Sequence, residues 1–181
     1  MTDWSQVARR IRVPTGFVFV ILYFWLARPT WTSIEIGSAI AALGLAVRTL
    51  ASGHVQKNER LTTSGPYAYL RNPLYFGSMI LAAGLALAAR NWWIAVCLVV
   101  IFVVIYLPVI RAEEAFLRST FTEFEEYSRH VPRLWPRFRA FGNARGNFSW
   151  HLYWKHREYN AVLGTAIILV VLAAKLLWWS G

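Results

Sequence analysis

The feature that most constrains this chain is a series of five apolar stretches, each close to the length that crosses a bilayer. A membrane-spanning helix needs about 20 predominantly apolar residues, with about 17–25 as the working range. The stretches cover residues 13–27, 31–50, 74–89, 92–110 and 161–179. Only 15% of the 181 residues are charged, whereas soluble domains carry about 25%. The sequence therefore predicts an all-α polytopic membrane helix bundle, one domain over residues 1–181, with five transmembrane helices.

Lysine and arginine residues are divided unequally between the two ends of these predicted helices. All but three of the 19 lie in the N-terminal segment, the second connection or the long fourth connection, the exceptions being Arg28, Arg90 and Lys175. Cationic residues concentrate on the cytoplasmic side of membrane proteins. We therefore expect an integral protein of the bacterial inner membrane with a cytoplasmic N-terminus. The net charge of +10 then reflects orientation and contact with anionic membrane lipids, and nucleic acid is not an expected partner.

The connections differ greatly in length. The outer ones, residues 28–30 and 90–91, are too short to hold a site, whereas the inner ones cover residues 51–73 and 111–160. Loops this long are uncommon unless they fold or carry a function, so we expect a pocket on the cytoplasmic face. A metal site is not expected, because Cys97 is the only cysteine and the histidines lack the usual ligand spacing.

Two motifs should meet at this face. Tyr75 opens the third apolar stretch, and the adjacent Glu113 and Glu114 follow the fourth. Since the two stretches form a hairpin that turns at residues 90–91, both motifs should lie at the same end of it. Two neighbouring carboxylates repel each other and favour a nearby cation. That cation is either Arg111 or a cationic small ligand, and the sequence leaves both possibilities open.

The ordered motifs resemble the superfamily of isoprenylcysteine carboxyl methyltransferases and phosphatidylethanolamine N-methyltransferases, which are integral membrane enzymes. The resemblance covers about residues 44–136 and rests on Gly65-Pro66-Tyr67, Arg71-Asn72-Pro73-Leu74-Tyr75-Phe76-Gly77, Glu113-Glu114 and Tyr127-Ser128-Arg129-His130-Val131-Pro132. It implies S-adenosylmethionine as cofactor in a pocket on the cytoplasmic face. The cofactor-binding residues it implies are Tyr67, Arg71, Asn72, Pro73, Tyr75, Gly77, Glu113 and Glu114. Asn72 stands where the family has histidine, so a histidine base is not expected there.

The implied substrate is a lipophilic molecule that enters from the membrane. Candidates are a lipidated cysteine carboxylate, a phospholipid amine, and a long-chain phenol, quinol or thiol. Residues 147–160 mix aromatic and charged side chains, which is typical either of an interfacial helix or of a substrate entrance. In the second interpretation Arg157 and Glu158 face the pocket as catalytic residues. Pro108 predicts a kink that opens a gap to the lipid.

Two further expectations follow from the sequence. Leu117, Phe121, Phe124 and Ser128 share one stripe of a predicted amphipathic helix that continues to Arg129. Two other functions remain possible, a non-enzymatic transporter or scaffold and an oxidoreductase like the sterol reductases. The sequence lacks the midplane polar residues that are typical of transporters. It also lacks the additional nicotinamide-binding segment that such an oxidoreductase would need.

Overall fold

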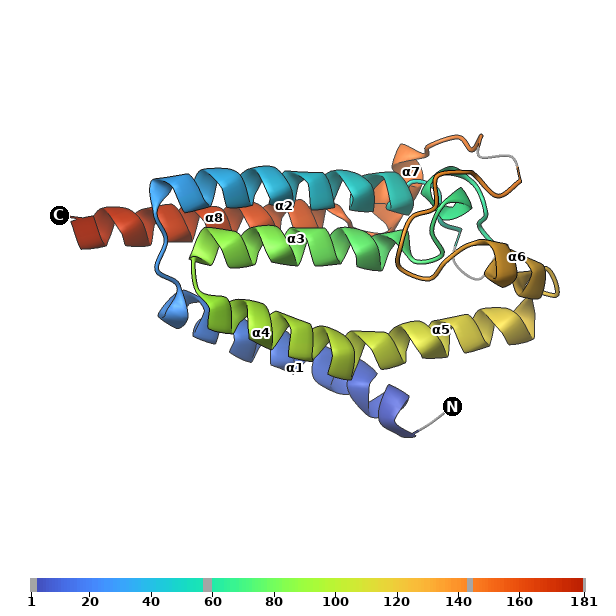
Figure 1. Cartoon of the computed structure of the whole chain (residues 1–181), viewed down its shortest axis with the longest axis horizontal. Coiled ribbons are helices and arrows are strands. Elements are labelled where there is room, and N and C mark those ends of the chain that lie inside the picture. The colour runs from blue at the N-terminus through green and yellow to red at the C-terminus, as the bar shows by residue number, and fades with distance from the viewer. Residues whose placement is uncertain (1–2, 57–59, 143–144, 181) are drawn as a thin grey trace.

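The computed structural model describes residues 3–56, 60–142 and 145–180, and every regular element in these ranges is helical. The elements are α1 (Asp3–Leu26), α2 (Trp31–Ser52), η1 (Gly65–Ala68), α3 (Pro73–Ala89), α4 (Trp92–Ile101), η2 (Phe102–Tyr106), α5 (Leu107–Thr120), α6 (Phe124–His130), α7 (Trp150–Lys155) and α8 (Tyr159–Ser180). The predicted all-α class is confirmed. The long helices lie side by side, with the short helices and long connections gathered at one end (Figure 1).

All five predicted stretches are helical, with boundaries that differ by a few residues. Three helices in the described part of the chain are long and apolar enough to cross a membrane: Trp31–Ser52, Trp92–Thr120 and Tyr159–Trp178. Pro14–Leu26 and Pro73–Ala89 are apolar but shorter. The helix that contains the first stretch begins earlier than expected, at Asp3. The count of five spans and the cytoplasmic N-terminus stay predictions.

The fourth stretch continues past its expected end as one helical path from Trp92 to Thr120. Pro108 lies in the first turn of α5, and the π-helical turn η2 stands directly before it. Proline lacks the N–H that an α-helix needs, and a wider turn accommodates such a break in the bonding pattern. A π-helical turn therefore precedes Pro108, whereas the expected kink and its gap to the lipid stay predictions.

Helices α2 and α3 pack with their backbones in close contact, because glycines meet along the seam. A Cβ atom added to Gly44 would lie 2.4 Å from the backbone nitrogen of Leu81, and one added to Gly84 would lie 2.5 Å from that of Ala41. Helices in membranes commonly associate through such small residues. This seam fixes Arg48 of α2 beside the first turns of α3.

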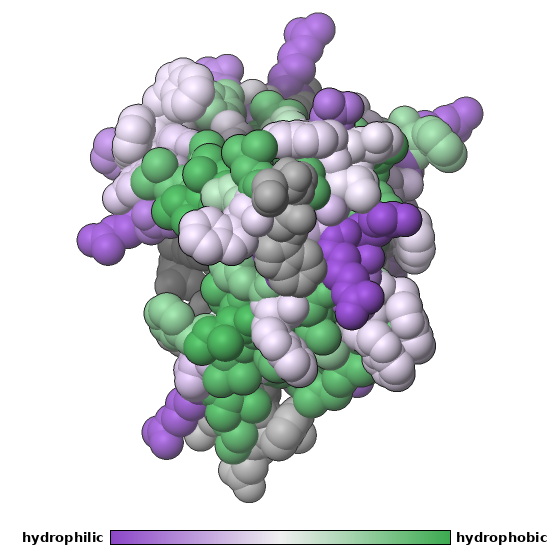
Figure 2. Space-filling view, turned by 90° about the vertical axis from the view of Figure 1, so that its left-hand side faces the viewer, coloured by the Kyte–Doolittle hydropathy of each residue, from purple (hydrophilic) through white to green (hydrophobic). Residues whose placement is uncertain are grey.

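Hydrogen bonds hold together the bundle end that carries the C-terminus. Lys175 of α8 donates to the carbonyl oxygens of Phe24 and Ala27 at 2.5 and 2.8 Å. Asn91 caps α4 and donates to the carbonyl of Leu26 at 2.8 Å. Seen from this end, the surface is mostly apolar, with hydrophilic side chains set apart from one another (Figure 2). Neither of the two cavities described below is lined by residues of the short connections there.

The predicted continuous amphipathic helix to Arg129 is wrong. Helix α5 ends at Thr120, Phe121 adopts an extended conformation, and α6 begins at Phe124. The break lets Phe124 and Tyr127 of α6 pack with Val131 in a buried cluster that Leu61 and Phe141 also contact. A straight helix would leave these side chains on an exposed stripe. Their burial therefore favours the broken path over a straight helix.

Candidate functional site

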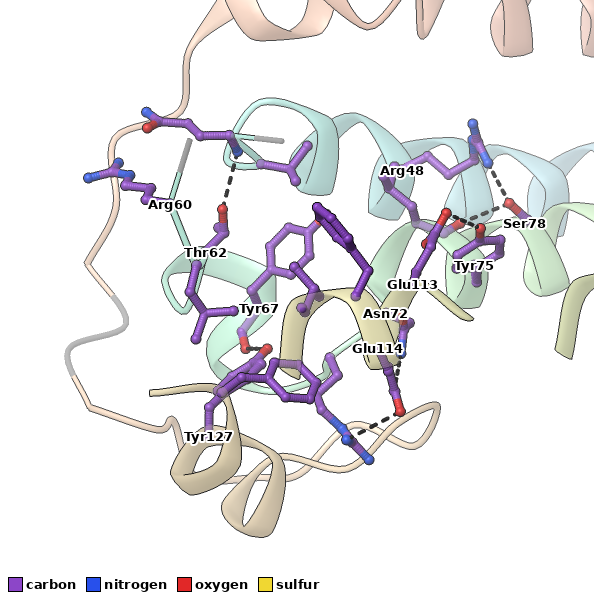
Figure 3. A pocket seen from close by; sticks show the side chains of 18 of the residues that line it. Arg48, Arg60, Thr62, Tyr67, Asn72, Tyr75, Ser78, Glu113, Glu114 and Tyr127 are labelled. Carbon is purple, nitrogen blue, oxygen red and sulfur yellow. Dashed lines mark hydrogen bonds and ion pairs between the residues drawn. The ribbon is translucent and has the colours of Figure 1, made fainter. Parts of the chain in front are cut away.

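A cavity of about 550 Å³ lies at the end of the bundle where the long connections gather. Its wall comes from Arg48 of α2, from residues within 55–56 and 60–78, and from the helical path from Tyr106 to Leu117, α6 and Glu158. Figure 3 shows that polar side chains from distant parts of the sequence point toward one another here. The volume falls within the range of small-molecule sites, about 300–1,000 Å³.

Most of the residues expected at the site line this cavity. They are Tyr67, Arg71, Asn72, Tyr75, Glu113, Glu114 and Glu158. Pro73 and Gly77 are buried and are not among its lining residues. A Cβ atom on Gly77 would lie 2.8 Å from Cγ of Arg48 and 2.9 Å from the carbonyl oxygen of Gly44. Gly77 therefore allows helix packing, and Pro73 opens α3 with Asn72 as its cap.

Arg157 does not face the cavity. It is exposed and adopts a left-handed conformation with φ of 54°, which an L-residue adopts at a cost in free energy. The backbone turns at this residue from α7 into α8 and directs the next side chain, Glu158, into the cavity. The expectation that Arg157 and Glu158 both face the pocket is therefore wrong for Arg157. Of the two, only Glu158 lines the cavity.

Tyr75 and Glu113 meet as the hairpin geometry predicts. The phenol hydroxyl of Tyr75, in the first turn of α3, donates to Oε1 of Glu113 at 3.0 Å. Glu113 is exposed at the cavity. The Tyr75 ring also stands edge-on to that of Tyr106, with centroids 6.0 Å apart. A hydrogen-bonded carboxylate beside aromatic faces is a favourable place for a cationic group.

Glu114 points to a different set of partners. Arg133 donates to its Oε2 from Nη2 at 2.7 Å and from Nε at 3.0 Å, while Asn72 donates to Oε1 at 3.0 Å. Arg71 lies 3.5 Å from the same carboxylate. Hydrogen bonding to Glu114 raises the pKa of Arg133. The cation beside the glutamate pair is thus Arg133 with Arg71, not Arg111.

Arg71 combines this ion pair with an unsatisfied donor. Its Nε is the buried side-chain nitrogen or oxygen that has no hydrogen-bond partner in the described part of the chain. Burial lowers the pKa of Arg71, although Glu114 acts in the opposite direction. An unpaired buried donor costs free energy. Arg71 as a whole also lines the cavity, where a guanidinium suits an anionic group.

Arg48 was not assigned to the site from the sequence, yet it joins three elements there. Its Nη2 approaches Oε2 of Glu158 at 2.7 Å and its Nε approaches the same oxygen at 3.1 Å, while its Nη1 donates to the hydroxyl of Ser78. An arginine near the end of an otherwise apolar span is the signal that could have identified it, because such residues usually have a functional partner.

Two buried tyrosines close the cavity on the side of α6. The hydroxyl of Tyr127 donates to the backbone carbonyl of Tyr67 at 2.8 Å. Burial raises the pKa of both phenols above the ordinary value, so both are neutral at physiological pH. They supply neutral aromatic surface and no charge.

A second cavity, apolar and about 500 Å³ in volume, lies between α1, α3 and the α4–η2 path. Small residues line part of it, namely Gly16, Ala82, Ala83, Ala86 and Ala95, beside larger apolar side chains such as Phe19, Leu98 and Phe102. It shares Tyr75, Ser78 and Tyr106 with the polar cavity. The polar and apolar cavities therefore border on the same three side chains. We call the second one the apolar groove.

No group of three His, Cys, Asp or Glu side chains suited to a metal ion occurs among the residues that the structure describes.

Comparison with known proteins places the chain among membrane methyltransferases and their relatives. The cobalt-zinc-cadmium resistance protein CzcN of Cupriavidus metallidurans is 33% identical over 149 residues, which cover 78% of this chain and 68% of that protein. The nickel-cobalt-cadmium resistance protein NccN of Alcaligenes xylosoxydans xylosoxydans is 31% identical over 61% of this chain and 56% of its own length.

A eukaryotic enzyme is also similar. The protein-S-isoprenylcysteine O-methyltransferase of Schizosaccharomyces pombe is 30% identical over 96 residues, which cover 52% of this chain and 41% of that enzyme. No solved structure shows significant similarity. The profile of the phospholipid methyltransferase family matches residues 12–123, a range that contains Tyr75, Glu113 and most of the cavity wall. The chain belongs to the phospholipid methyltransferase family.

Proposed function

We propose that this protein transfers a methyl group from S-adenosylmethionine to a lipophilic acceptor at the cytoplasmic face of the bacterial inner membrane. The observation that carries the proposal is that the two cavities share Tyr75, Ser78 and Tyr106 as lining residues. A polar cofactor and an apolar acceptor would each find a matching environment and would meet at these side chains. Family membership supports the reaction class.

The residues of the polar cavity fit the cofactor. S-adenosylmethionine carries a carboxylate, an ammonium, a sulfonium, ribose hydroxyls and an adenine ring. The guanidinium of Arg71, which lines the cavity, suits the carboxylate, and Glu113 suits the ammonium or the ribose. The rings of Tyr67 and Tyr106, which line the cavity, suit adenine and the sulfonium. When bound, the cofactor supplies an electrophilic methyl group.

The task of the protein in such a reaction is alignment and the exclusion of water. Tyr75 is held by its hydrogen bond to Glu113, and Ser78 is held by Arg48, so two of the shared lining residues are fixed polar groups. Among the residues that the structure describes, neither histidine nor lysine lines the polar cavity. An acceptor that must lose a proton would transfer it to Glu113, whereas a carboxylate acceptor needs no base.

The acceptor class is proposed on the same ground. The small side chains lining the apolar groove leave room for a hydrocarbon chain. The acceptor therefore carries a long apolar tail, and its reactive head is a carboxylate, an amine, a phenol, a quinol or a thiol.

The test is transfer of labelled methyl from S-adenosylmethionine into a native lipid extract by the purified protein in detergent. We expect a labelled product that extracts into organic solvent, and we expect Tyr75→Phe to reduce its rate with little change in cofactor binding. Tyr69→Phe serves as the matched control, because Tyr69 is exposed and does not line the cavity. Absence of a labelled lipid would contradict the proposal. Thermal stabilisation by NADPH instead of S-adenosylhomocysteine would favour a reductase.

A further inference from the structure

A basic and aromatic loop, residues 133–139, stands beside the polar cavity without contributing its own aromatic side chains to it. Trp135 is 77% exposed and Phe138 is fully exposed. Arg137 and Arg139 flank Phe138 in the sequence. We call residues 133–139 the basic-aromatic loop.

The stretch of sequence that carries the loop is strongly cationic, although Glu114 contacts Arg133 and α6 just before it contains Glu125 and Glu126. Residues 127–157 contain seven lysine and arginine residues and no aspartate or glutamate. Indole rings are enriched at the boundary between hydrocarbon and water, and clusters of arginine and lysine bind anionic lipid headgroups. Exposed aromatic rings that alternate with arginine combine both properties.

Backbone hydrogen bonds fix the loop at the level where α3 begins. Arg71 donates its backbone N–H to the carbonyl of Pro132 at 2.9 Å, and Arg137 donates to the carbonyl of Tyr69 at 3.1 Å. Tyr69 and Arg71 lie two to four residues before Pro73, the first residue of α3. In a protein whose α3 crosses the membrane, the loop is thus held at the headgroup layer.

The same loop forms part of the cavity's support. Arg133, its first residue, makes two hydrogen bonds to Glu114, and its backbone carbonyl accepts from Asn72 at 3.2 Å. Glu114 and Asn72 both line the polar cavity. Any contact that holds the loop in place also holds this wall of the cavity.

We propose that the basic-aromatic loop binds anionic phospholipid headgroups and that this contact stabilises the polar cavity. Trp135 and Phe138 enter the headgroup layer, Arg139 pairs with lipid phosphates, and Arg133 connects the loop to Glu114. The lipid contact stands independently of the reaction, whereas its effect on the cavity rests on the proposed function.

The first test measures the environment of residue 138 directly. A Phe138→Cys variant, made in a Cys97→Ala background so that it holds a single thiol, is labelled with a polarity-sensitive fluorophore and placed in nanodiscs. We expect a blue shift of its emission in discs that contain phosphatidylglycerol, compared with discs of phosphatidylcholine alone. Arg139→Gln should reduce this shift. A Thr122→Cys variant, at an exposed position between α5 and α6, is the control and should show no shift.

The outcomes separate the proposal from its alternatives. A water-like emission in both disc types would overturn it, and so would an equal blue shift in phosphatidylcholine alone, which would show apolar insertion without recognition of anionic lipid. A blue shift that appears only on addition of cell cytosol would indicate a protein partner and would also overturn it. None of these readouts depends on methyl transfer, so failure here leaves the proposed reaction standing.

The second test measures the effect on the cavity. The dissociation constant of S-adenosylhomocysteine should be about fivefold lower in discs that contain phosphatidylglycerol, the effect expected from one arginine–lipid contact. Arg139→Gln should reduce this difference, whereas Arg145→Gln, outside the loop, should preserve it. Equal affinity in both disc types would refute the coupling between loop and cavity. No binding in either type, together with a blue shift at residue 138, would refute the proposed function while supporting the lipid contact.

Discussion

The hydroxyl of Tyr75 donates to the carboxylate of Glu113 at 3.0 Å, although 38 residues separate the two along the chain. The next residue, Glu114, points instead toward Arg133 and Asn72. Two adjacent acidic residues therefore have different partners. Glu113 is exposed at the cavity, whereas Glu114 is 7% exposed and ties three segments together. Substitutions of Glu113 and of Glu114 should therefore have different effects.

Replacement of Glu114 should lower stability. In Glu114→Gln, Arg71 and Arg133 lose the carboxylate that balances their charge, and the loss of one partner of a largely buried ion pair is strongly destabilising. Because Arg133 is partly exposed, we expect a moderate effect, about 2 kcal/mol in the free energy of unfolding. Thermal unfolding in detergent measures it. Glu125→Gln removes two exposed ion pairs, with Arg118 and Arg129, and should change stability by less than about 0.5 kcal/mol. Equal effects of the two substitutions would contradict this assignment.

The close packing of α2 against α3 at their glycines predicts that a larger residue there lowers stability. In Gly44→Ala the new Cβ would lie 2.4 Å from backbone nitrogen of Leu81, so α2 and α3 must separate. Overpacking of this kind costs about 1–3 kcal/mol. The matched control is Gly164→Ala in α8, where a Cβ meets no atom within 4 Å. A comparison of the two melting temperatures checks the prediction, which fails if the Gly164 variant is the less stable.

The buried phenols predict a loss of stability at high pH. Burial raises the pKa of Tyr127 above the ordinary value of about 10. The Tyr127 hydroxyl therefore loses its proton at a lower pH in the unfolded chain than in the folded one. The contribution of this residue to stability is complete below about pH 10 and decreases as the pH rises further. Tyr127→Phe should make the melting temperature less dependent on pH above 10. A pH profile as steep as that of the unmodified protein would show that Tyr127 does not titrate on unfolding.

A substitution that narrows the apolar groove should impair methyl transfer to the acceptor and leave cofactor binding unchanged. Ala82→Leu places a larger side chain in the groove and should reduce methyl transfer to long-chain acceptors by about tenfold. Binding of S-adenosylhomocysteine should not change. Ala166→Leu makes the same substitution at an exposed position of α8 and should leave both unchanged. Equal transfer rates for the two variants would place the acceptor elsewhere.

The parts of the fold that depend on local sequence could be predicted. The length of the apolar stretches predicted where the long helices lie, and the hairpin topology predicted the contact between Tyr75 and Glu113. The remaining features depend on three-dimensional paths that hydropathy does not specify. Arg48 and Glu158 are 110 residues apart, and their contact depends on how α8 packs against α2. The contact between Arg133 and Glu114 depends on the route of an irregular loop.

Two errors have the same origin. Gly77 belongs to a motif that includes cavity residues, but its place on α3 faces α2, so its small size serves packing. Arg157 is adjacent to a cavity residue in the sequence, but its left-handed conformation turns it outward. Membership in a motif does not determine the direction of each side chain.

Direct binding of S-adenosylhomocysteine is the measurement on which the assignment of the polar cavity rests. Titration calorimetry of the purified protein should detect one site per chain. Glu113→Gln should weaken the affinity at least tenfold, the effect of losing one charged hydrogen bond of about 1.5–3 kcal/mol, while leaving the melting temperature of the unliganded protein unchanged. Undetectable binding by the unmodified protein, or equal affinity in the Glu113→Gln variant, would contradict a methyl-donor site between Tyr75 and Glu113.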